Sequence, residues 1–247
     1  MSDSTLCLDF GNTRKKVALF NASGEMIQTA DLDGEDTLSQ VRHWVETHEP
    51  ACSILSSVIH HDESLEPYLA TSTSFHRLSH QTRLPFTTPV SKPDSIGADR
   101  LALAAAAVHY FPGKNNLVIG LGSCITYNFI NKYHQFLGGG ISPGKSMRFR
   151  AMHEYTAKLP LTEALFHPPL VGYDTATNLQ SGVMHGMAAE IDGIIDQYAA
   201  KYRNFNVVLT GGDTPYFATQ LKNGIFADFN FLFKGLYALS LLNNKGL

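Results

Sequence analysis

The stretch LDFGNT, residues 8–13, decides how the fold is interpreted. The apolar run 6–10 is typical of a buried strand, a glycine turn breaks it, and residues 16–20 form a second strand. The same order of strand, tight turn and strand recurs around IGLGSC, residues 119–124. Two copies of this unit, each leading into helices, indicate an α/β protein with two similar halves facing a cleft. Ordinary glycine-containing hairpins, which any α/β protein has, are the alternative.

Periodicity predicts further elements on both sides of these two units. We expect the halves to cover residues 1–112 and 113–247. A loop or lid is expected over residues 79–94, where polar residues and prolines gather. The other predicted strands cover residues 26–32, 52–58, 117–120, 125–130, 133–137 and 206–209. The predicted helices cover residues 35–46, 64–70, 100–109, 145–157, 175–202, 216–222 and 231–242.

The composition excludes several classes of protein. Apolar residues make up 44% of the 247 residues and charged residues 17%, which fits a chain with a real core and not a disordered one. A formal net charge of −3 argues against a dedicated nucleic-acid binder. The polar start does not resemble a signal peptide, and no apolar run approaches the ~18–20 residues that span a membrane. Cys7, Cys52 and Cys124 show no CxxC spacing, so we expect reduced thiols in a cytoplasmic protein.

The first turn carries side chains that suit a nucleotide phosphate. Asp9 ends the first strand, where its carboxylate would hold hydrated Mg²⁺. The backbone N–H groups around Gly11 and the side chains of Asn12 and Thr13 would bind phosphate oxygens, and Arg14 would add positive charge. An ordinary hairpin turn, in which Asp, Gly and Asn are favoured, is the alternative. The chain has neither a GxxxxGK[ST] loop nor a GxGxxG fingerprint between a strand and a helix.

A second candidate, GADR at residues 97–100, lies between the expected loop and an alanine-rich helix. Asp99 suits a general base for a substrate hydroxyl, and Arg100 suits a guanidinium that grips a substrate carboxylate. The structural alternatives are as simple: Asp99 is well placed as a helix N-cap, or the two residues form a local ion pair of little consequence. These residues by themselves leave both interpretations open.

A third candidate, TGGD at residues 210–213, ends one strand and opens a helix. Glycines there let a flat ring or a ribose approach the backbone closely. A plain turn between strand and helix, capped by Asp213 or Thr214, is the alternative. The glycine run 138–140 follows an expected hairpin and is a weak signal by itself. The eleven histidines show no HExxH spacing, and no Ser-His-Asp or Cys-His set can be assembled from the sequence.

The order and spacing of these motifs resemble the type III pantothenate kinases over nearly the whole chain. The resemblance is carried by DFGNT at residues 9–13, KP at 92–93, IGADRL at 96–101, FLGGGISPG at 136–144, TAKLP at 156–160, GYDT at 172–175, LTGGD at 209–213 and LFKGL at 232–236. It implies two ribonuclease H-like halves of the actin and sugar-kinase superfamily. It also implies ATP-dependent phosphorylation of pantothenate to 4′-phosphopantothenate, the first step of coenzyme A biosynthesis.

The resemblance further implies roles for individual residues. The family's metal-side aspartate matches Asp9, and its catalytic base matches Asp99. Its substrate-binding positions match Gly97, Arg100 and Thr175, and the threonine reaches the substrate from the partner subunit of a homodimer whose substrate pocket lies at the interface. The positions along the nucleotide match Asp9, Gly11, Asn12, Thr13, Ser123, Gly211 and Gly212. The implied ligands are ATP, Mg²⁺ and pantothenate, with no nucleic acid and no membrane.

One segment departs from the family pattern. The family's second phosphate motif usually reads DxGTAxTxD, whereas residues 120–128 read GLGSCITYN, so Gly120 and Asn128 replace its first and last carboxylates. The family associates the leading aspartate with a monovalent cation site, so a requirement for K⁺ or NH₄⁺ is left open. Ser123 keeps a hydroxyl for phosphate contact. A non-catalytic, regulatory ligand-binding relative and a kinase for another small hydroxy acid are the alternatives.

Overall fold

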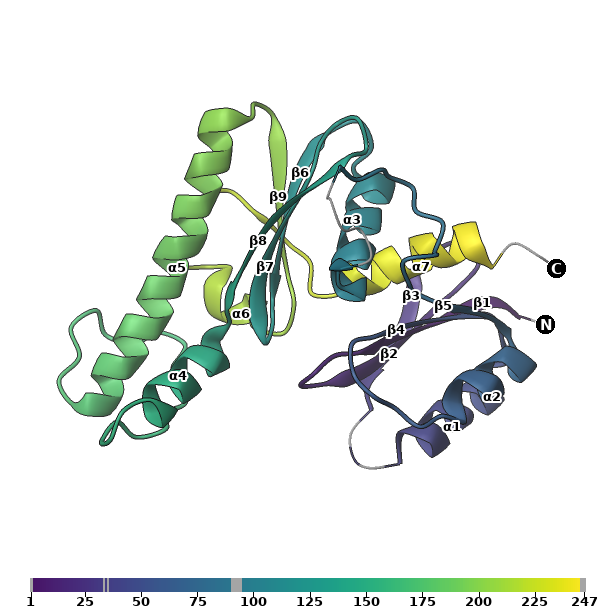
Figure 1. The fold of residues 1–247 in the computed structure, drawn as a ribbon, viewed down its shortest axis with the longest axis horizontal. Coiled ribbons are helices and arrows are strands. Elements are labelled where there is room, and N and C mark those ends of the chain that lie inside the picture. Colours follow the sequence, from purple (N-terminus) through teal and green to yellow (C-terminus); the bar gives the residue numbers. More distant parts are fainter. Residues whose placement is uncertain (1, 33, 35, 90–94, 245–247) are drawn as a thin grey trace. The chain divides into compact units, whose positions relative to one another are not determined.

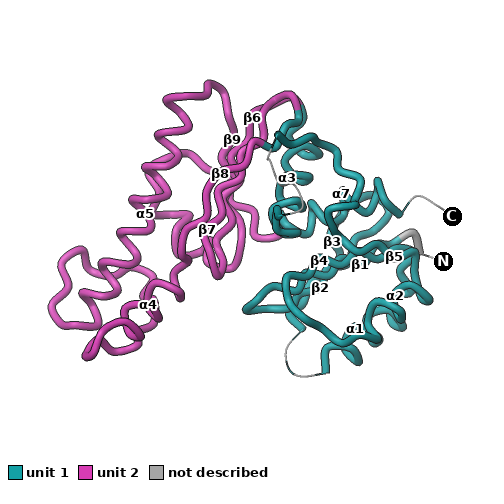
Figure 2. The backbone as a smooth tube through the Cα atoms, in the orientation of Figure 1, with its two compact units in different colours: residues 1–112, 134–136, 231–247 teal, residues 113–133, 137–230 magenta. Residues whose placement is uncertain are grey.

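Two compact units make up the computed structural model, each built on one five-stranded sheet (Figures 1 and 2). The residues that the structure describes are 2–32, 34, 36–89 and 95–244. The first unit consists of residues 1–112, 134–136 and 231–247, and the second of residues 113–133 and 137–230. The mixed α/β class expected from the sequence is confirmed.

The first unit is a mixed sheet with helices on both faces (Figure 1). Its strands are β1 (Ser2–Phe10), β2 (Lys15–Phe20), β3 (Met26–Asp31), β4 (Pro50–Ser57) and β5 (Ser74–Arg77), in the order β3-β2-β1-β4-β5. Its helices are α1 (Thr37–His48), α2 (Leu65–Ser72), α3 (Ala98–Tyr110) and α7 (Phe231–Asn243). Strand β1 pairs antiparallel with β2 and parallel with β4, so it occupies the centre of the sheet.

Alternation along β1 decides which side chains reach each face of this sheet. Leu6, Leu8 and Phe10 point to one face and join a buried apolar cluster with α1 and α2. Cys7 and Asp9, which alternate with them, point to the opposite face, where α3 and α7 pack. The strand therefore places Asp9 on the same face as α3.

The second unit repeats the strand order of the first. Its strands are β6 (Asn115–Leu121), β7 (Cys124–Ile130), β8 (Phe136–Pro143), β9 (Phe205–Thr210) and β10 (Phe226–Ala227), in the order β10-β9-β6-β7-β8. Its helices are α4 (Lys145–Glu154), α5 (Thr175–Lys201) and α6 (Thr214–Phe217). Strand β6 pairs antiparallel with β7 and parallel with β9, as β1 does with β2 and β4. LDFGNT and IGLGSC therefore occupy equivalent points of two sheets with the same topology, as the repeat in the sequence predicts.

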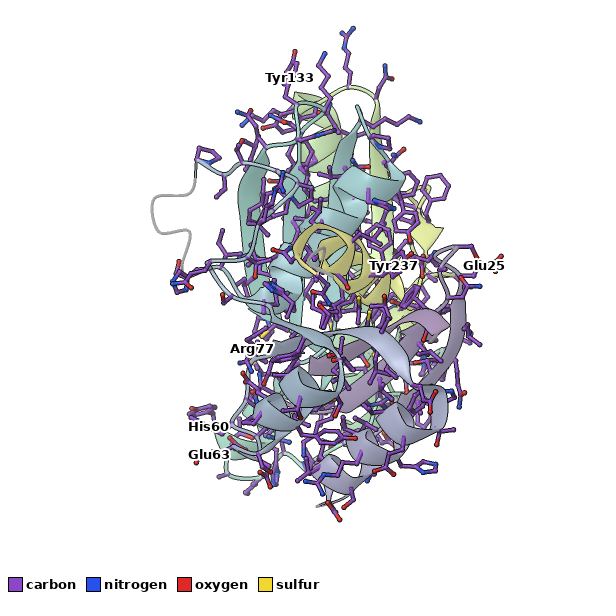
Figure 3. The ribbon with its side chains drawn as sticks, turned by 90° about the vertical axis from the view of Figure 1, so that its right-hand side faces the viewer. Glu25, His60, Glu63, Arg77, Tyr133 and Tyr237 are labelled. Carbon is purple, nitrogen blue, oxygen red and sulfur yellow. The ribbon has the colours of Figure 1, made fainter. Side chains whose placement is uncertain are left out.

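The C-terminal helix α7 belongs to the first unit although it follows the second unit in the sequence. A Cβ on Gly235 would lie 1.9 Å from the carbonyl oxygen of Ala102, so only glycine lets α7 approach α3 this closely. Tyr237 stacks on Phe20 with ring centroids 4.8 Å apart, on the side of the unit where the β2–β3 turn carries Glu25 (Figure 3). Helix α7 belongs to the first unit because its apolar side chains are buried against the sheet of that unit.

The compact units therefore differ from the predicted halves, 1–112 and 113–247, in the placement of residues 134–136 and 231–247. Whether residues 1–112 and 113–247 are two actin-like halves is a separate question, and that division remains a prediction. In the part of the chain that the structure describes, no helix combines the length and the apolar character needed to cross a membrane.

Several element boundaries differ from those expected. The sequence did not reveal β5 and β10, which have four and two residues, because strands this short show no usable alternation. Strand β8 begins at Phe136 and runs through the glycines 138–140. A Cβ on Gly139 would lie 1.9 Å from the carbonyl oxygen of Tyr127, so these glycines permit close strand pairing and do not form a loop. The helix expected at 216–222 is the single turn α6.

Candidate functional site

Asp9 and Asp99 are two carboxylates that β1 and the start of α3 bring together in the first unit. Asp9 is half-buried, with Lys16 opposite it on β2 and Ser56 opposite it on β4. Burial, followed by the negative charge of Asp99, raises the pKa of Asp9 from 3.8 to about 7, although the Ser56 hydroxyl and Lys16 act to lower it. Two carboxylates this close repel each other when both are ionised, and a cation between them would relieve the repulsion.

The turn after β1 is short and closed by its own backbone. The Gly11 N–H donates to the carbonyl oxygen of Arg14 at 3.0 Å. Asn12 and Thr13 lie exposed at the tip, directly beyond the strand end that carries Asp9. Arg14 lies beside a carboxylate of its own, with Nη1 3.6 Å from Oδ2 of Asp31. The turn therefore presents two exposed polar side chains. The positive charge expected from Arg14 is partly neutralised by the carboxylate of Asp31.

The GADR segment forms the start of α3. Gly97 is the N-cap residue and Asp99 is the second residue of the helix, so the alternative interpretation of Asp99 as the N-cap is wrong. A carboxylate in the first turn is favoured by the helix dipole. A Cβ on Gly97 would lie 2.6 Å from Oδ1 of Asp99, so glycine leaves the room that this carboxylate occupies. Asp99 is only half-buried, so solvent reaches its side chain.

Arg100 is held over an aromatic ring of the same unit. Its guanidinium carbon lies 5.4 Å from the centroid of Phe136, within the range of a cation–π interaction. The Phe136 N–H donates to the carbonyl oxygen of Thr87 at 2.8 Å, and the Thr88 hydroxyl donates to the carbonyl oxygen of Phe136 at 2.9 Å. Part of the expected loop therefore anchors the ring that positions Arg100. Residues 90–94, the rest of that loop with the KP motif, lie outside the described residues.

Three segments of the second unit meet backbone to backbone, and we call them the glycine junction: residues 121–124, 143–145 and 210–213. The Gly144 N–H donates to the carbonyl oxygen of Ser123 at 3.1 Å, and a Cβ on Gly144 would lie 2.2 Å from the carbonyl oxygen of Gly122. Gly211 has φ +101°, and its Cβ would lie 2.2 Å from the carbonyl oxygen of Leu121. Only glycine is compatible with these contacts.

A lysine that the motifs did not identify lies in the glycine junction. Lys145, the first residue of α4, has Nζ 3.4 Å from Oδ1 of Asp213 and 4.3 Å from the ring centroid of Tyr216. Asp213 occupies the N-cap position of α6, as the alternative interpretation has it, but its side chain makes no capping hydrogen bond. Gly212, in contrast to Gly211, has open space where a Cβ would be. Nothing in the spacing of the sequence links Lys145 to TGGD, because only the tertiary fold brings α4 to the end of β9.

Thr175 is the first residue of α5, and it is exposed. Asp174 caps this helix: its Oδ1 accepts from the Thr177 N–H at 2.8 Å, and the Thr177 hydroxyl accepts from the Asp174 N–H at 3.1 Å. The capping box fixes the direction in which the helix begins. Among the described residues, no hydrogen bond connects Thr175 to another predicted site residue.

The departure at residues 120–128 has a structural counterpart in the β6–β7 pair. Asn128 is fully buried, and its amide donates to the carbonyl oxygen of Val118 at 3.2 Å and to Oγ1 of Thr126 at 3.1 Å. Gly120 pairs with Thr126 across the two strands. The side chain at 128 therefore stabilises the hairpin from within, as a neutral amide in a site where an unpaired carboxylate would be costly.

The sequence of the whole chain has close counterparts. The family model of type III pantothenate kinases matches residues 5–197. This chain belongs to the type III pantothenate kinase family. Curated members of this family include proteins of Christiangramia forsetii, 39% identical over 94% of this chain and 95% of that protein, and of Bacteroides fragilis, 38% identical over 97% and 98%. A member from Cytophaga hutchinsonii is 40% identical over 90% and 92%.

Solved structures with low sequence identity share the fold. A putative Baf family transcriptional activator from Campylobacter jejuni has a TM-score of 0.59 at 20% identity and covers 95% of this chain and 96% of its own. A glucokinase from an Antarctic psychrotroph has a TM-score of 0.55 at 11% identity and covers 98% and 100%. A ROK family glucokinase from Streptomyces griseus has a TM-score of 0.53 at 12% identity, with the same coverage. The chain therefore shares its fold with these sugar kinases, and the fold class expected from the sequence is confirmed.

The residues of this family member are suited to Mg²⁺ but do not form a closed metal cage. Among the described residues, no group of three or more His, Cys, Asp or Glu side chains could hold a metal ion. Mg²⁺ commonly takes one or two carboxylates and fills its other positions with water and phosphate oxygens. Asp9 provides one such carboxylate, and its burial beside the negative charge of Asp99, which raises its pKa, favours a cation near it. Ser56 Oγ, buried without a hydrogen bond of standard geometry, adds an oxygen beside Asp9.

Proposed function

We propose that this chain transfers the γ-phosphoryl group of ATP to the hydroxyl group of pantothenate and so forms 4′-phosphopantothenate, the first step towards coenzyme A. The observation that carries the proposal is the carboxylate pair Asp9 and Asp99 in a protein of this family. Phosphoryl transfer depends on positioning and on charge neutralisation, and a metal-side carboxylate and a base are the two acidic groups that it needs. The family relatives favour the kinase over a non-catalytic ligand-binding protein.

In this proposal Asp99 is the general base. Its carboxylate accepts the proton of the pantothenate hydroxyl as that oxygen bonds to the γ-phosphorus, and the bond to the β-γ bridging oxygen breaks to release ADP. Its half-buried position at the start of α3 keeps it within reach of a substrate hydroxyl. Asp9 would hold Mg²⁺, which neutralises phosphate charge when it is bound. Asn12 and Thr13, exposed beyond Asp9, would donate hydrogen bonds to phosphate oxygens.

Arg100 and Gly97 would bind pantothenate in the same unit. The planar guanidinium of Arg100 matches the two oxygens of the pantothenate carboxylate, and its position over Phe136 restricts its orientation before the substrate arrives. Ser123, Gly211 and Gly212 would line the nucleotide in the second unit. Gly212 is exposed, with nothing within 4 Å of the position that a Cβ would take, so it would leave room for a ribose or a ring. The supply of ATP and of coenzyme A precursors makes the cytoplasm the proposed location.

We further propose a homodimer in which Thr175 of the partner subunit completes the substrate site. The segment before Thr175, residues 155–173, carries large apolar side chains that are exposed in the isolated chain. They are Tyr155, Leu161, Leu165, Phe166, Leu170, Val171 and Tyr173. Monomeric proteins rarely leave this much contiguous sequence apolar and exposed, and a second copy is the simplest cover. Thr175 follows directly and would lie at such an interface.

The test is ADP release from ATP and Mg²⁺ by the purified full chain, with and without pantothenate, in buffers with and without K⁺ or NH₄⁺. We expect turnover that depends on pantothenate. Its response to the monovalent cation shows whether Gly120 has removed that requirement. A folded protein that turns over in none of these buffers would contradict the kinase and favour the non-catalytic alternative. Turnover with another small hydroxy acid but not with pantothenate would correct the substrate alone.

A further inference from the structure

We propose that Lys145 is a phosphate-binding residue, whose ammonium contacts the polyphosphate of the nucleotide in the glycine junction. The inference rests on the proposed function, because it assumes that the second unit receives the nucleotide. Lys145 lies outside the family motifs in the sequence. It is assigned from its position between the turn that carries Ser123 and the segment that carries Gly211 and Gly212.

The ammonium of Lys145 is fixed in place before any ligand binds. The side chain is only 12% exposed, and its Nζ is positioned by two groups, the carboxylate of Asp213 and the ring of Tyr216. The ring of Tyr216 is itself held by stacking on Phe166 at 4.2 Å between centroids. A lysine restrained in this way has already lost the side-chain entropy that a surface lysine would lose on binding a ligand.

The same ammonium retains capacity for another partner. The 3.4 Å distance from Nζ to Oδ1 of Asp213 exceeds the ~2.7–2.9 Å of a charge-assisted hydrogen bond. This contact therefore occupies at most one of the three N–H donors of the lysine. Lys145 also stands in the first turn of α4, which has no acidic residue, where a positive charge is unfavourable. An anion at this position would offset that cost.

The glycines of the junction are of two kinds. Gly144 and Gly211 are packed, since a Cβ on either would collide with backbone oxygens of residues 121–123. Gly122 and Gly212 have nothing within 4 Å of the position that a Cβ would take. The packed glycines hold the three segments together, and the open glycines leave space beside them. Gly122 and Gly212 are exposed, and the N–H groups of Gly122, Gly144 and Asp213 already donate to backbone carbonyl oxygens, so the contact expected for a nucleotide phosphate there is the ammonium of Lys145.

The test compares the binding of ADP and of adenosine to the full chain by calorimetry. For Lys145→Met we expect the Kd of ADP to rise by about tenfold or more, because a charge-assisted contact is lost, and the Kd of adenosine to change by less than about twofold. Lys145→Arg keeps the positive charge and a phosphate-binding side chain, so it should keep the ADP affinity within about threefold. Lys222→Met is the matched control, since Lys222 pairs with Asp196 at 2.7 Å in the same unit and should leave both affinities unchanged.

Asp213→Asn separates a phosphate contact from a purely structural ion pair. It removes the carboxylate and leaves the ammonium, so we expect ADP affinity to stay the same or to rise. Unchanged ADP binding by Lys145→Met would overturn the proposal and leave the kinase intact. An equal loss of ADP and adenosine affinity, or a loss in Asp213→Asn as large as in Lys145→Met, would also overturn it, because both results indicate loop positioning. A folded wild-type protein that binds no ADP would refute the proposed function, and this inference with it.

Discussion

Replacing Asp9 by Asn should stabilise the protein at neutral and alkaline pH while removing activity. The structure holds this carboxyl group in a half-buried site near Asp99, and its pKa rises from 3.8 to about 7. The unfolded chain ionises Asp9 near 3.8, so between about pH 4 and pH 7 the folded state binds more protons than the unfolded state. The free energy of unfolding therefore falls as the pH rises through this window and stays lower above it.

The size of the effect follows from the shift. About three pKa units at 1.36 kcal/mol per unit give about 4 kcal/mol as an upper bound. Solvent reaches part of the carboxyl group, so we expect about 2–4 kcal/mol to be measured. Asn has nearly the shape of Asp but no charge. The variant therefore lacks the free-energy cost that ionised Asp9 imposes on the folded wild type at high pH. Burial raises the pKa of Asp9 most, Asp99 adds to this, and Ser56 and Lys16 oppose it; all three neighbours remain in the variant.

The assay is urea unfolding of the full chain at a series of pH values from about 4.5 to about 8.5, with EDTA present to exclude metal ions. The advantage of Asp9→Asn over the wild type should grow with pH by the amount above. The matched control is Asp31→Asn, an exposed carboxylate paired with Arg14 and Lys16, which should change stability by less than about 0.5 kcal/mol at every pH. If the wild type and Asp9→Asn show the same dependence on pH, the reasoning about a half-buried charge beside Asp99 is refuted.

Three further predictions concern the glycine junction, the substrate and the dimer. Gly211→Ala should lower the free energy of unfolding by about 2–4 kcal/mol in urea titrations, because its φ of +101° and the nearby carbonyl oxygen of Leu121 exclude a side chain. Gly212→Ala should change it by less than about 1 kcal/mol. Equal effects of the two substitutions would contradict this reasoning. Arg100→Lys should raise KM for pantothenate about tenfold in steady-state assays and leave KM for ATP nearly unchanged. A raised KM for ATP with an unchanged KM for pantothenate would contradict the role of Arg100 in binding pantothenate. Val171→Asp should give monomers in light scattering, while Ile27→Asp, also at an exposed apolar position, should not; a dimer that tolerates the aspartate would move the interface elsewhere.

The central strands of both units were predictable because their apolar runs are long and bounded by glycine turns. The duplication was predictable because LDFGNT and IGLGSC each show the order strand, tight turn and strand in the sequence. In the structure the two segments lie at equivalent ends of β1 and β6. Strands β5 and β10 were not, since they are short and owe their conformation to pairing with β4 and β9. The sequence pattern places the glycines 138–140 after a hairpin, yet they form part of β8. Glycine is required there because β8 lies close to the neighbouring strand, and not because the chain turns.

The candidate site was predictable where chemistry is local and not where it depends on tertiary contacts. Asp9 and Asp99 stand close to glycines in short motifs, and the structure brings their charges together as their types suggested. Lys145 and Asp213 are 68 residues apart, by the difference of their numbers, and their pairing depends on how α4 meets the end of β9. The capping role considered for Asp99 was wrong, because α3 already begins at Ala98, whereas Asp213 does occupy the N-cap position of α6, without a capping hydrogen bond from its side chain.

The central claim is that Asp99 acts as the base in phosphorylating pantothenate. The most direct measurement is the rate of 4′-phosphopantothenate formation, followed by mass spectrometry, for the wild type and for Asp99→Asn at equal concentrations of folded protein. We expect product from the wild type and a rate at least about a hundredfold lower for the variant, with ADP binding retained. A variant that forms 4′-phosphopantothenate at a near-normal rate would contradict the role of Asp99, and a wild type that forms none would contradict the kinase itself.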